Sequence, residues 1–333
     1  MNKIDQYYFD LIDKQRNVYQ QAHLYQQNRA DVSQYIDWLQ CIETGEPLTL
    51  KNGVLTNISL TKSYKITDNI ADFRDQSILD HDKKWSRLNE KFLNYHKSLT
   101  SYALMRNLPL THYVSAVTNL AHVKGKTIVD VGAGTGQSQC SFYRYPEENT
   151  YFLVDPNVRL LHDQFIRVYP QLLETKMNHI LSHAEKLPFK DHSVDIVMSL
   201  ASIDHFADYK AFIKEAHRIL KKDGQLLIFS HLDVPLGGRI LTKLKTLKLS
   251  LPVLLEIVAR KLFQLANRVS VDDHTLHFHN AKPMEEAMQE SGFTIAKKES
   301  FMRYFYLLGK KNRFLCGILI SLTTLFFPLV MCF

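Results

Sequence analysis

"TIVDVGAGTGQSQC", residues 127–140, decides the fold, because it passes from an apolar run into three closely spaced glycines. The branched residues before the glycines favour an extended strand, and an almost uninterrupted apolar run predicts burial on both faces, as in a parallel sheet. Gly132, Gly134 and Gly136 then allow a sharp turn and a close approach of the backbone to a ligand. Such a turn commonly leads into a helix whose first N–H groups face negative charge. The stretch therefore indicates a nucleotide or an amino-acid carboxylate as the ligand.

The spacing of these glycines separates two cofactors. A dinucleotide site carries GxGxxG with an acid about 20 residues later, whereas this loop reads GxGxG, with Asp130 two residues before the first glycine. The other candidate is S-adenosylmethionine, whose ammonium and carboxylate can be held by Asp130 and by backbone donors around Ala133. The stretch here resembles the first motif of the class I methyltransferases, acid-x-G-x-G-x-G. The resemblance implies an α/β fold, a Rossmann-like sheet of seven strands with helices on both faces, and S-adenosylmethionine as cofactor.

The next two strands supply further candidate contacts to this cofactor. "YFLVDPN" ends in Asp155 and Pro156, and a carboxylate at a strand end can accept from both ribose hydroxyls; Asp155 could equally cap the following helix. The later "SHAEKLPF" is similar to the adenine loop of the family, in which an acid usually precedes the alanine. His183 stands at that place here, before Ala184 and Glu185. We therefore expect the backbone near Ala184, or the side chain of Glu185, to contact the adenine amino group instead. The alternative for Glu185 is a solvated acid in a loop.

The segments that follow continue the alternation of strands and helices. "DHSVDIVMSLASIDHF" predicts a strand that includes Ser199, a further candidate cofactor residue, and "YKAFIKEAHRILKKDGQLLIFSHL" predicts a helix and then a strand. Lys221, Lys222 and Gly224 are expected to end that helix, with cations at its carbonyl end and glycine as terminator. A last helix, a "GF" junction and two closing strands follow. Order and spacing extend the resemblance over residues 85–311, the predicted methyltransferase domain.

Composition and cysteine positions narrow the class of protein. The chain has 333 residues, of which 45% are hydrophobic and 23% charged, enough for a full core with additions. The cysteines at positions 41, 140, 316 and 332 show no paired spacing that would indicate disulfides or a metal site. The first residues are charged and polar, unlike a secretory signal. We therefore expect a protein that is cytoplasmic or faces the cytoplasm.

Two segments precede the predicted domain. Residues 1–40 are polar and predict a helical extension without a recognisable motif. Residues 41–80 contain a hairpin signal, apolar residues on either side of "KNG", and they resemble the small zinc ribbon often fused ahead of bacterial methyltransferases. That ribbon holds zinc with four thiolates, of which this sequence keeps one. The four places are taken by Cys41, Thr44, Asn57 and Leu60. We expect a hairpin without metal; an unrelated β-hairpin is the alternative.

Positive charge gathers in two zones of the chain. The net charge is +7, and residues 239–268 alone carry seven Lys or Arg against one Glu, within a predicted insert at 236–270. Its mixture of apolar and basic residues is typical of a helix on a membrane surface, and the alternative is a lid packed on the core.

The second zone, 297–313, ends in "KKNR" and leads into residues 314–333, which carry no charge. These could reach about 30 Å as a helix, so they predict a C-terminal membrane anchor with a cationic flank, or a helix buried on the core or in a dimer.

Histidines are the candidate catalytic groups. Methyl transfer needs a well-placed nucleophile and exclusion of water, and a base only where the acceptor must lose a proton. His205 follows the fourth strand, where the family often carries a histidine, while His274 and His277 lie in "DDHTLHFHN", which is similar to a segment after the lid of relatives. Histidine can accept a proton near neutral pH. The alternatives are structural histidines, or a metal held by His274, His277 and His279, for which the sequence offers no completing thiolate or carboxylate set.

The sequence as a whole predicts transfer of a methyl group to a small apolar or lipid-linked acceptor at the cytoplasmic face of a membrane. A soluble metabolite as acceptor, or a cofactor-binding module without catalysis, are the alternatives that stay open. Nucleic acid is a less favoured partner, because the basic residues are mixed with Leu and Ile instead of aromatic stacking groups.

Overall fold

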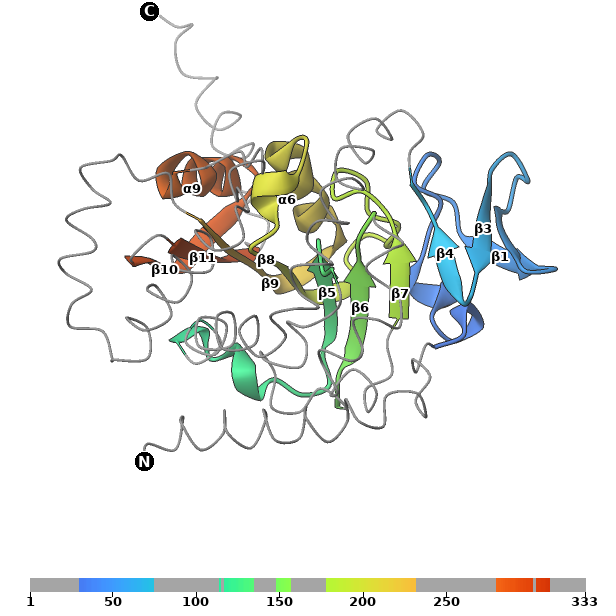
Figure 1. Cartoon of the computed structure of the whole chain (residues 1–333), viewed down its shortest axis with the longest axis horizontal. Helices are drawn as coiled ribbons and strands as arrows, with labels where there is room; N and C mark the ends of the chain where they lie inside the picture. Colours follow the sequence, from blue (N-terminus) through green and yellow to red (C-terminus); the bar gives the residue numbers. More distant parts are fainter. Residues whose placement is uncertain are drawn as a thin grey trace, which may run out of the picture.

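One mixed sheet organises the described part of the chain. The computed structural model describes residues 30–74, 114, 117–134, 148–156, 178–231, 280–301 and 304–311. Within these residues eleven strands pair in the order β1-β2-β3-β4-β7-β6-β5-β8-β9-β11-β10 (Figure 1). The last seven in that order correspond to the predicted seven-stranded sheet. The first four extend it at one end, an addition that the sequence analysis did not foresee.

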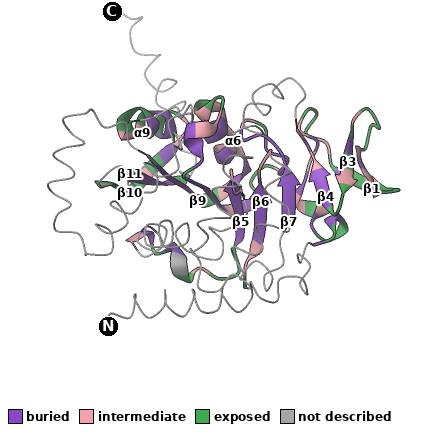
Figure 2. Cartoon of the chain, in the orientation of Figure 1, coloured by how far each residue is buried: buried purple, intermediate pink, exposed green. Residues whose placement is uncertain are grey.

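The parallel centre of the sheet follows the predicted apolar segments. It consists of β5 (Thr127–Val131), β6 (Thr150–Val154), β7 (Asn178–Leu181), β8 (Val194–Leu200) and β9 (Leu220–His231). Every residue of β5 is buried, because β6 and β8 flank it and both faces of the sheet are covered. Figure 2 shows that burial continues from β5 across β6 and β7 into β4. The prediction of a doubly covered central strand is therefore confirmed.

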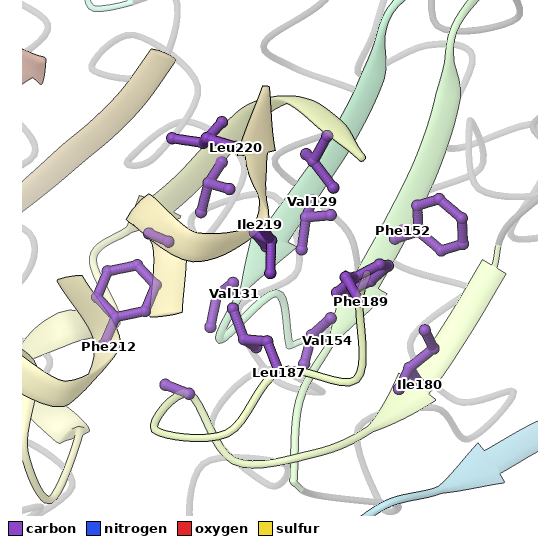
Figure 3. Packing of buried hydrophobic residues seen from close by; sticks show 14 of the residues in the cluster. Val129, Val131, Phe152, Val154, Ile180, Leu187, Phe189, Phe212, Ile219 and Leu220 are labelled. Carbon is purple, nitrogen blue, oxygen red and sulfur yellow. The ribbon is translucent and has the colours of Figure 1, made fainter. Parts of the chain in front are cut away.

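An antiparallel pair and two α-helices complete the region around the sheet. β10 (Phe293–Phe301) and β11 (Tyr304–Lys311) are antiparallel, and β11 pairs with β9. α6 (Tyr209–Ile219) begins at Asp208, whose carboxylate accepts from two N–H groups of the first turn. α9 (Ala281–Glu290) precedes β10. Both helices contribute buried side chains to the same hydrophobic cluster, in which Phe212 and Ile219 of α6 pack over the central strands (Figure 3).

The C-terminal end of α6 differs from the prediction. The helix ends at Ile219, and Leu220 is already extended and paired with Val194 of β8. The residue with left-handed backbone in this stretch is Asp223, with φ of 64°. The chain enters the sheet directly after the helix, so no glycine terminator is needed. Strand β9 therefore contains the three residues that were wrongly predicted to end the helix, Lys221, Lys222 and Gly224.

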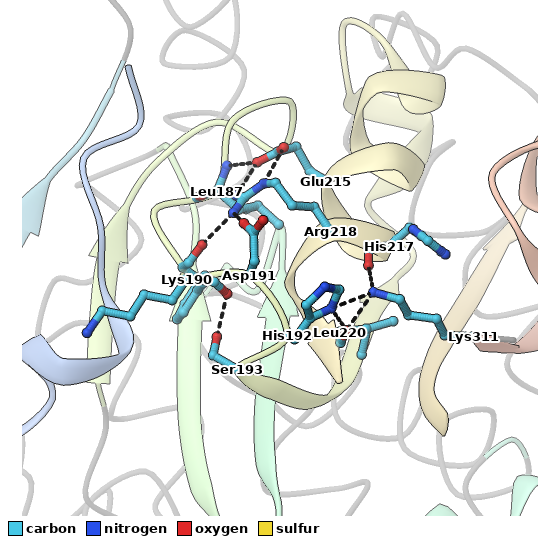
Figure 4. Close-up of polar contacts among 11 residues, drawn as sticks. Leu187, Lys190, Asp191, His192, Ser193, Glu215, His217, Arg218, Leu220 and Lys311 are labelled. Atoms are coloured by element: carbon cyan, nitrogen blue, oxygen red, sulfur yellow. Dashed lines mark hydrogen bonds and ion pairs between the residues drawn. The ribbon is translucent and has the colours of Figure 1, made fainter. Parts of the chain in front are cut away.

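Lys311 satisfies the carbonyl end of α6 from the neighbouring strand (Figure 4). Its side chain is buried, and its ammonium donates to the carbonyls of His217 and Leu220 and bonds Nδ1 of His192. A cation is favoured at this end of a helix, where carbonyls lack partners within the helix. The sequence analysis counted Lys311 in the cationic "KKNR" flank of the tail. That part of the prediction was wrong, because this ammonium lies inside the protein.

Replacing Lys311 with methionine is expected to lower the free energy of unfolding by about 1–3 kcal/mol, because the carbonyls of His217 and Leu220 lose their charged donor. Denaturant unfolding followed by circular dichroism measures this change. The control is Lys310→Met at the exposed neighbouring position, where we expect less than about 0.5 kcal/mol. Equal stabilities of the two variants would show that Lys311 does not hold the helix end.

Arg218 attaches the segment between β7 and β8 to α6 (Figure 4). Its guanidinium donates to the carboxylates of Glu215 and Asp191 and to the carbonyls of Leu187 and Phe189. The N–H of Leu187 in turn donates to Glu215. Planar, multidentate bonding of this kind fixes a loop in one orientation. The residues just after β7 are therefore held against the helix.

Residues 30–74 are continuous with the sheet. Two short 3-10 helices, η2 (Val32–Gln34) and η3 (Ile36–Trp38), come first. The predicted hairpin follows as β1 (Leu48–Lys51) and β2 (Val54–Asn57), and a second hairpin as β3 (Ser63–Thr67) and β4 (Ile70–Asp72). β4 then pairs in parallel with β7. Tyr35, Leu39 and Phe73 share the cluster that contains Phe152 and Val154, so this segment completes the main core.

A hydrogen-bonded cluster occupies the places that resemble a zinc ribbon. The amide nitrogen of the buried Asn57 lies within hydrogen-bonding distance of oxygens of Thr44, Glu46, Ser59 and Thr61. Sγ of Cys41 lies 3.0 Å from the Tyr64 hydroxyl, and Leu60 is exposed with φ of 57°. No group of three or more His, Cys, Asp or Glu that could hold a metal occurs in the part of the chain that the structure describes. Polar side-chain bonds hold this turn together.

Candidate functional site

The glycine turn after β5 lies against the end of β6. The backbone N–H groups of Gly132 and Ala133 both donate to the carbonyl of Val154. Asp155 follows Val154 directly, and its Oδ2 accepts from the N–H of Gly134 at 3.0 Å. The carboxyl ends of parallel strands share one edge of a sheet, and ligands of open α/β sheets bind at that edge. The structure therefore brings the glycine turn and the Asp155 carboxylate together there.

Gly132 sits where a side chain cannot fit. Its φ is +72°, and a Cβ built on it would lie 2.5 Å from Cβ of Ser202. The Ser202 hydroxyl donates to the carbonyl of Val131 and bonds the hydroxyl of Ser199, which is fully buried. The turn therefore packs on Ser202, which directly precedes η9 (Ile203–His205), and through Ser202 on Ser199 of β8. Ser199, a predicted cofactor residue, lies beneath the turn as part of this support.

Asp130 is a buried carboxylate without a hydrogen-bond partner among the described residues. It is 1% exposed, and neither of its oxygens is bonded. Burial, and then the charge of Asp155, raise the pKa of Asp130 to about 8. A buried acid of this kind is costly unless a cation or donor meets it. S-adenosylmethionine carries an ammonium and a sulfonium, so the unpartnered acid beside a turn with glycine at positions 132 and 134 fits this cofactor.

The segment after β7 forms the next part of this edge. His183 and Ala184 are buried. Oε1 of Glu185, which is partly exposed, accepts from the backbone N–H of Asp208 at 3.0 Å. Glu185 therefore helps to hold the start of α6, a role in addition to the predicted contact with adenine.

Two residues that the sequence analysis missed also reach this edge. Asp72 ends β4, and Arg74 donates through Nη1 to the carbonyl of Pro156 at 3.4 Å. No local pattern indicated them, because they precede the predicted domain and depend on the pairing of β4 with β7. Pro156, a predicted cofactor residue, is thus in contact with the N-terminal segment.

His205 is the one candidate catalytic residue within the described ranges. It ends η9 at the carboxyl end of β8, and its Nε2 lies 4.0 Å from Oδ1 of the buried Asp204. The side chain of His205 is 24% exposed, so a small acceptor at this edge could reach it. η9 follows Ser202, which packs under the glycine turn. The histidine and the turn therefore share the same edge of the sheet.

Several predicted features lie outside the described residues. These are Gly136, His274, His277 and His279, the basic insert 236–270, the tail 314–333 and most of the extension 1–40. They stay predictions. The helices of the described ranges include none with the length and apolar character needed to cross a membrane.

Part of the chain matches a known protein family and two curated relatives. The profile of the methyltransferase domain family Methyltransf_11 matches residues 129–228. The uncharacterized methyltransferase YcgJ of Bacillus subtilis is 30% identical over 104 residues, which is 31% of this chain and 40% of the relative. The ubiquinone/menaquinone biosynthesis C-methyltransferase UbiE of Neisseria meningitidis is 29% identical over 170 residues, 49% of this chain and 67% of the relative. The chain thus spans less than half of the first relative and about two thirds of the second.

Solved structures give a weaker likeness. The crystal structure of the YcgJ protein from Bacillus subtilis has 15% identity and a TM-score of 0.41, covering 61% of this chain and all of that one. The profile match itself begins in β5 and ends in β9, so it contains the glycine turn, Asp130 and Asp155. Residues 129–228 therefore contain a methyltransferase domain of the class that uses S-adenosylmethionine as methyl donor.

Proposed function

We propose that this chain binds S-adenosylmethionine between the glycine turn and the end of β6 and transfers its methyl group to a small apolar or lipid-linked acceptor. The observation that carries the proposal is the unpartnered, buried Asp130 next to a turn whose N–H already orients Asp155. In this proposal Asp130 meets the cationic methionyl end of the cofactor. Asp155 accepts from the ribose hydroxyls, with one oxygen fixed by Gly134.

The cofactor supplies an activated methyl carbon and a good leaving group. What remains for the protein is to place the acceptor atom in line and to keep water out. The turn around Gly132 is packed against Ser202, and Ala133 is buried. This packing favours a rigid turn that keeps water out of the cofactor site. His205 is our candidate to accept a proton where the acceptor is a hydroxyl, and no base is needed for an acceptor that is already nucleophilic.

The acceptor class is inferred from two sources. The relative UbiE is named for C-methylation in ubiquinone and menaquinone biosynthesis. This chain also carries apolar stretches mixed with or flanked by cations at 239–268 and 314–333, a composition that suits contact with lipid. We therefore place an apolar or lipid-linked acceptor, such as a quinone precursor, first among small molecules.

A labelling experiment tests this function. The purified protein is incubated with methyl-labelled S-adenosylmethionine and a membrane lipid extract, and label is counted in organic and aqueous products. We expect label in the organic phase, lowered at least about tenfold by Asp155→Ala at subsaturating cofactor, since a charged acceptor of two hydrogen bonds is lost. Label in an aqueous product would assign a soluble metabolite instead. Tight cofactor binding without transfer to any extract would support a binding module and contradict the enzyme.

A further inference from the structure

We propose that Arg74, held by Asp72, is a positioning residue of the cofactor site that fixes the Asp155–Pro156 turn from outside the methyltransferase core. The inference rests on the function proposed above and adds to it. It makes the N-terminal segment 30–74 part of the cofactor pocket, at the end that would hold the nucleoside.

The topology carries the first step. β4 and β7 are parallel, with Asp72 opposite Leu181, and the N–H of Phe73 donates to the Leu181 carbonyl at 2.7 Å. The chain therefore leaves β4 at the same edge at which β7 ends. The N–H of Asp155 donates to the carbonyl of Ile180 in β7. The ends of β4, β7 and β6 are thus neighbours, although residues 72 and 155 are far apart in sequence.

The contacts of the guanidinium carry the second step. Nε and Nη2 of Arg74 donate to Oδ1 and Oδ2 of Asp72 at 2.9 and 2.6 Å, and its backbone N–H donates to Oδ1 at 3.1 Å. Nη1 donates to the carbonyl of Pro156. Paired bonds between the planar guanidinium and the carboxylate leave the group one orientation. Arg74 is therefore pre-organised to hold the residue that follows Asp155.

The charge of Asp72 supports the same arrangement. Partial burial raises the pKa of Asp72, but the bonds and charge of Arg74, together with the charge of His183, keep that pKa below its usual value. Asp72 is therefore ionised at neutral pH. The Asp72–Arg74 pair contacts Pro156 after β6, and the end of β4 lies beside the end of β7, which His183 follows. These are the two loops to which sequence analysis assigned the ribose and the adenine.

The same pair is a poor candidate for a purely structural role. Its side chains are partly exposed, at 26% for Arg74 and 31% for Asp72, so screening by solvent reduces the contribution of the ion pair to stability. Removing the guanidinium should therefore leave the protein folded. If Arg74 positions the cofactor site, its loss should weaken ligand binding but leave the stability of the protein unchanged. If its role is structural, its loss should lower the stability.

The test measures ligand affinity by calorimetry. The ligands are S-adenosylhomocysteine and methylthioadenosine, which keeps the nucleoside but lacks the amino-acid end. We expect Arg74→Ala to raise Kd for both by about tenfold, the effect of losing a charged hydrogen bond, and Arg74→Lys to restore only part of the affinity, because lysine has no planar fork. The control is Lys124→Ala, which removes an exposed ion pair with Glu148 before β5, at the opposite edge, and should leave Kd unchanged.

A double-mutant cycle with Asp155→Ala decides how Arg74 acts. If Arg74 works through the Asp155–Pro156 turn, its loss should cost much less affinity once Asp155 is alanine. Additive losses, or an Arg74→Ala variant that binds like the wild type, would overturn the inference while the wild type still binds. A wild type that binds neither ligand would overturn the proposed function and, with it, this inference.

Discussion

Replacing Asp130 with asparagine is expected to weaken S-adenosylmethionine binding by about 100-fold or more, the cost of removing one partner from a buried charge pair. The carboxylate is buried and unpartnered, with a pKa raised to about 8 by burial and by the charge of Asp155. In the free protein at pH 7 it is mostly protonated. A cation that arrives beside it favours the ionised form, so binding should release a proton. The affinity of the wild type should therefore rise as pH increases from about 6 to about 8, and that of the asparagine variant should not.

The stability of the free protein should depend on the same group. The ordinary pKa of an aspartate is 3.8, and that of Asp130 in the folded protein is about 8. Between these values the folded state binds a proton that the unfolded state has lost. The contribution of Asp130 to the free energy of unfolding is therefore fully present below pH 4 and declines as pH rises towards 8. Asp130→Asn removes this decline, so the variant should gain stability relative to the wild type between pH 6 and pH 8.5.

Two measurements check the Asp130 prediction. Calorimetry at pH 7 in buffers with different ionisation enthalpies counts the protons released on binding. Urea unfolding at pH 6 and at pH 8.5 measures the free energy of unfolding. Asp37→Asn, at an exposed acid, is the control and should change neither. An Asp130→Asn variant that binds the cofactor like the wild type, with no change in proton release, would show that Asp130 does not face a cation.

Local signals explain why the centre of the fold could be predicted. β5 and its glycine turn are encoded within a few residues, and the hairpin of β1 and β2 has Asn52 and Gly53 at positive φ, as its "KNG" sequence indicated. The closing helix and two strands were expected from the resemblance to the methyltransferase fold, and they are present as α9, β10 and β11. The helix end after Ile219 was missed, because it depends on the pairing of Leu220 with β8 and on Lys311 from a distant strand.

The sequence selected candidate site residues but could not show their surroundings. The sequence selected Asp130 and Asp155 by their spacing from the glycines, yet it could not show that Asp130 lacks a partner or that Gly134 bonds Asp155. The sequence analysis missed Arg74, because its role depends on the pairing of β4 with β7, a contact between residues more than 100 positions apart. Pairings of this range leave no periodic trace in a single sequence.

Gly132→Ala is the second change with a large expected effect: it should lower the free energy of unfolding by about 2–5 kcal/mol and abolish measurable cofactor binding. A residue with a Cβ at φ of +72° costs about 1–2 kcal/mol. The new methyl group would also lie 2.5 Å from Cβ of Ser202 and 3.2 Å from the ring of Phe206, and overpacking of this kind costs about 1–3 kcal/mol more. Relief of the clash must move the turn, and with it the N–H of Gly134 that holds Asp155.

The chain supplies a matched control for the backbone part of this effect. Gly125 also has positive φ, at +64°, but a Cβ there would meet nothing within 4 Å. Gly125→Ala should therefore cost only the backbone strain, and the difference between the two variants measures the clash. Ser202→Gly in the Gly132→Ala background removes the clashing atoms and should recover part of the lost stability. If both alanine variants were equally stable and Gly132→Ala still bound S-adenosylhomocysteine in calorimetry, the turn would not be the tightly packed support that the proposed cofactor site requires.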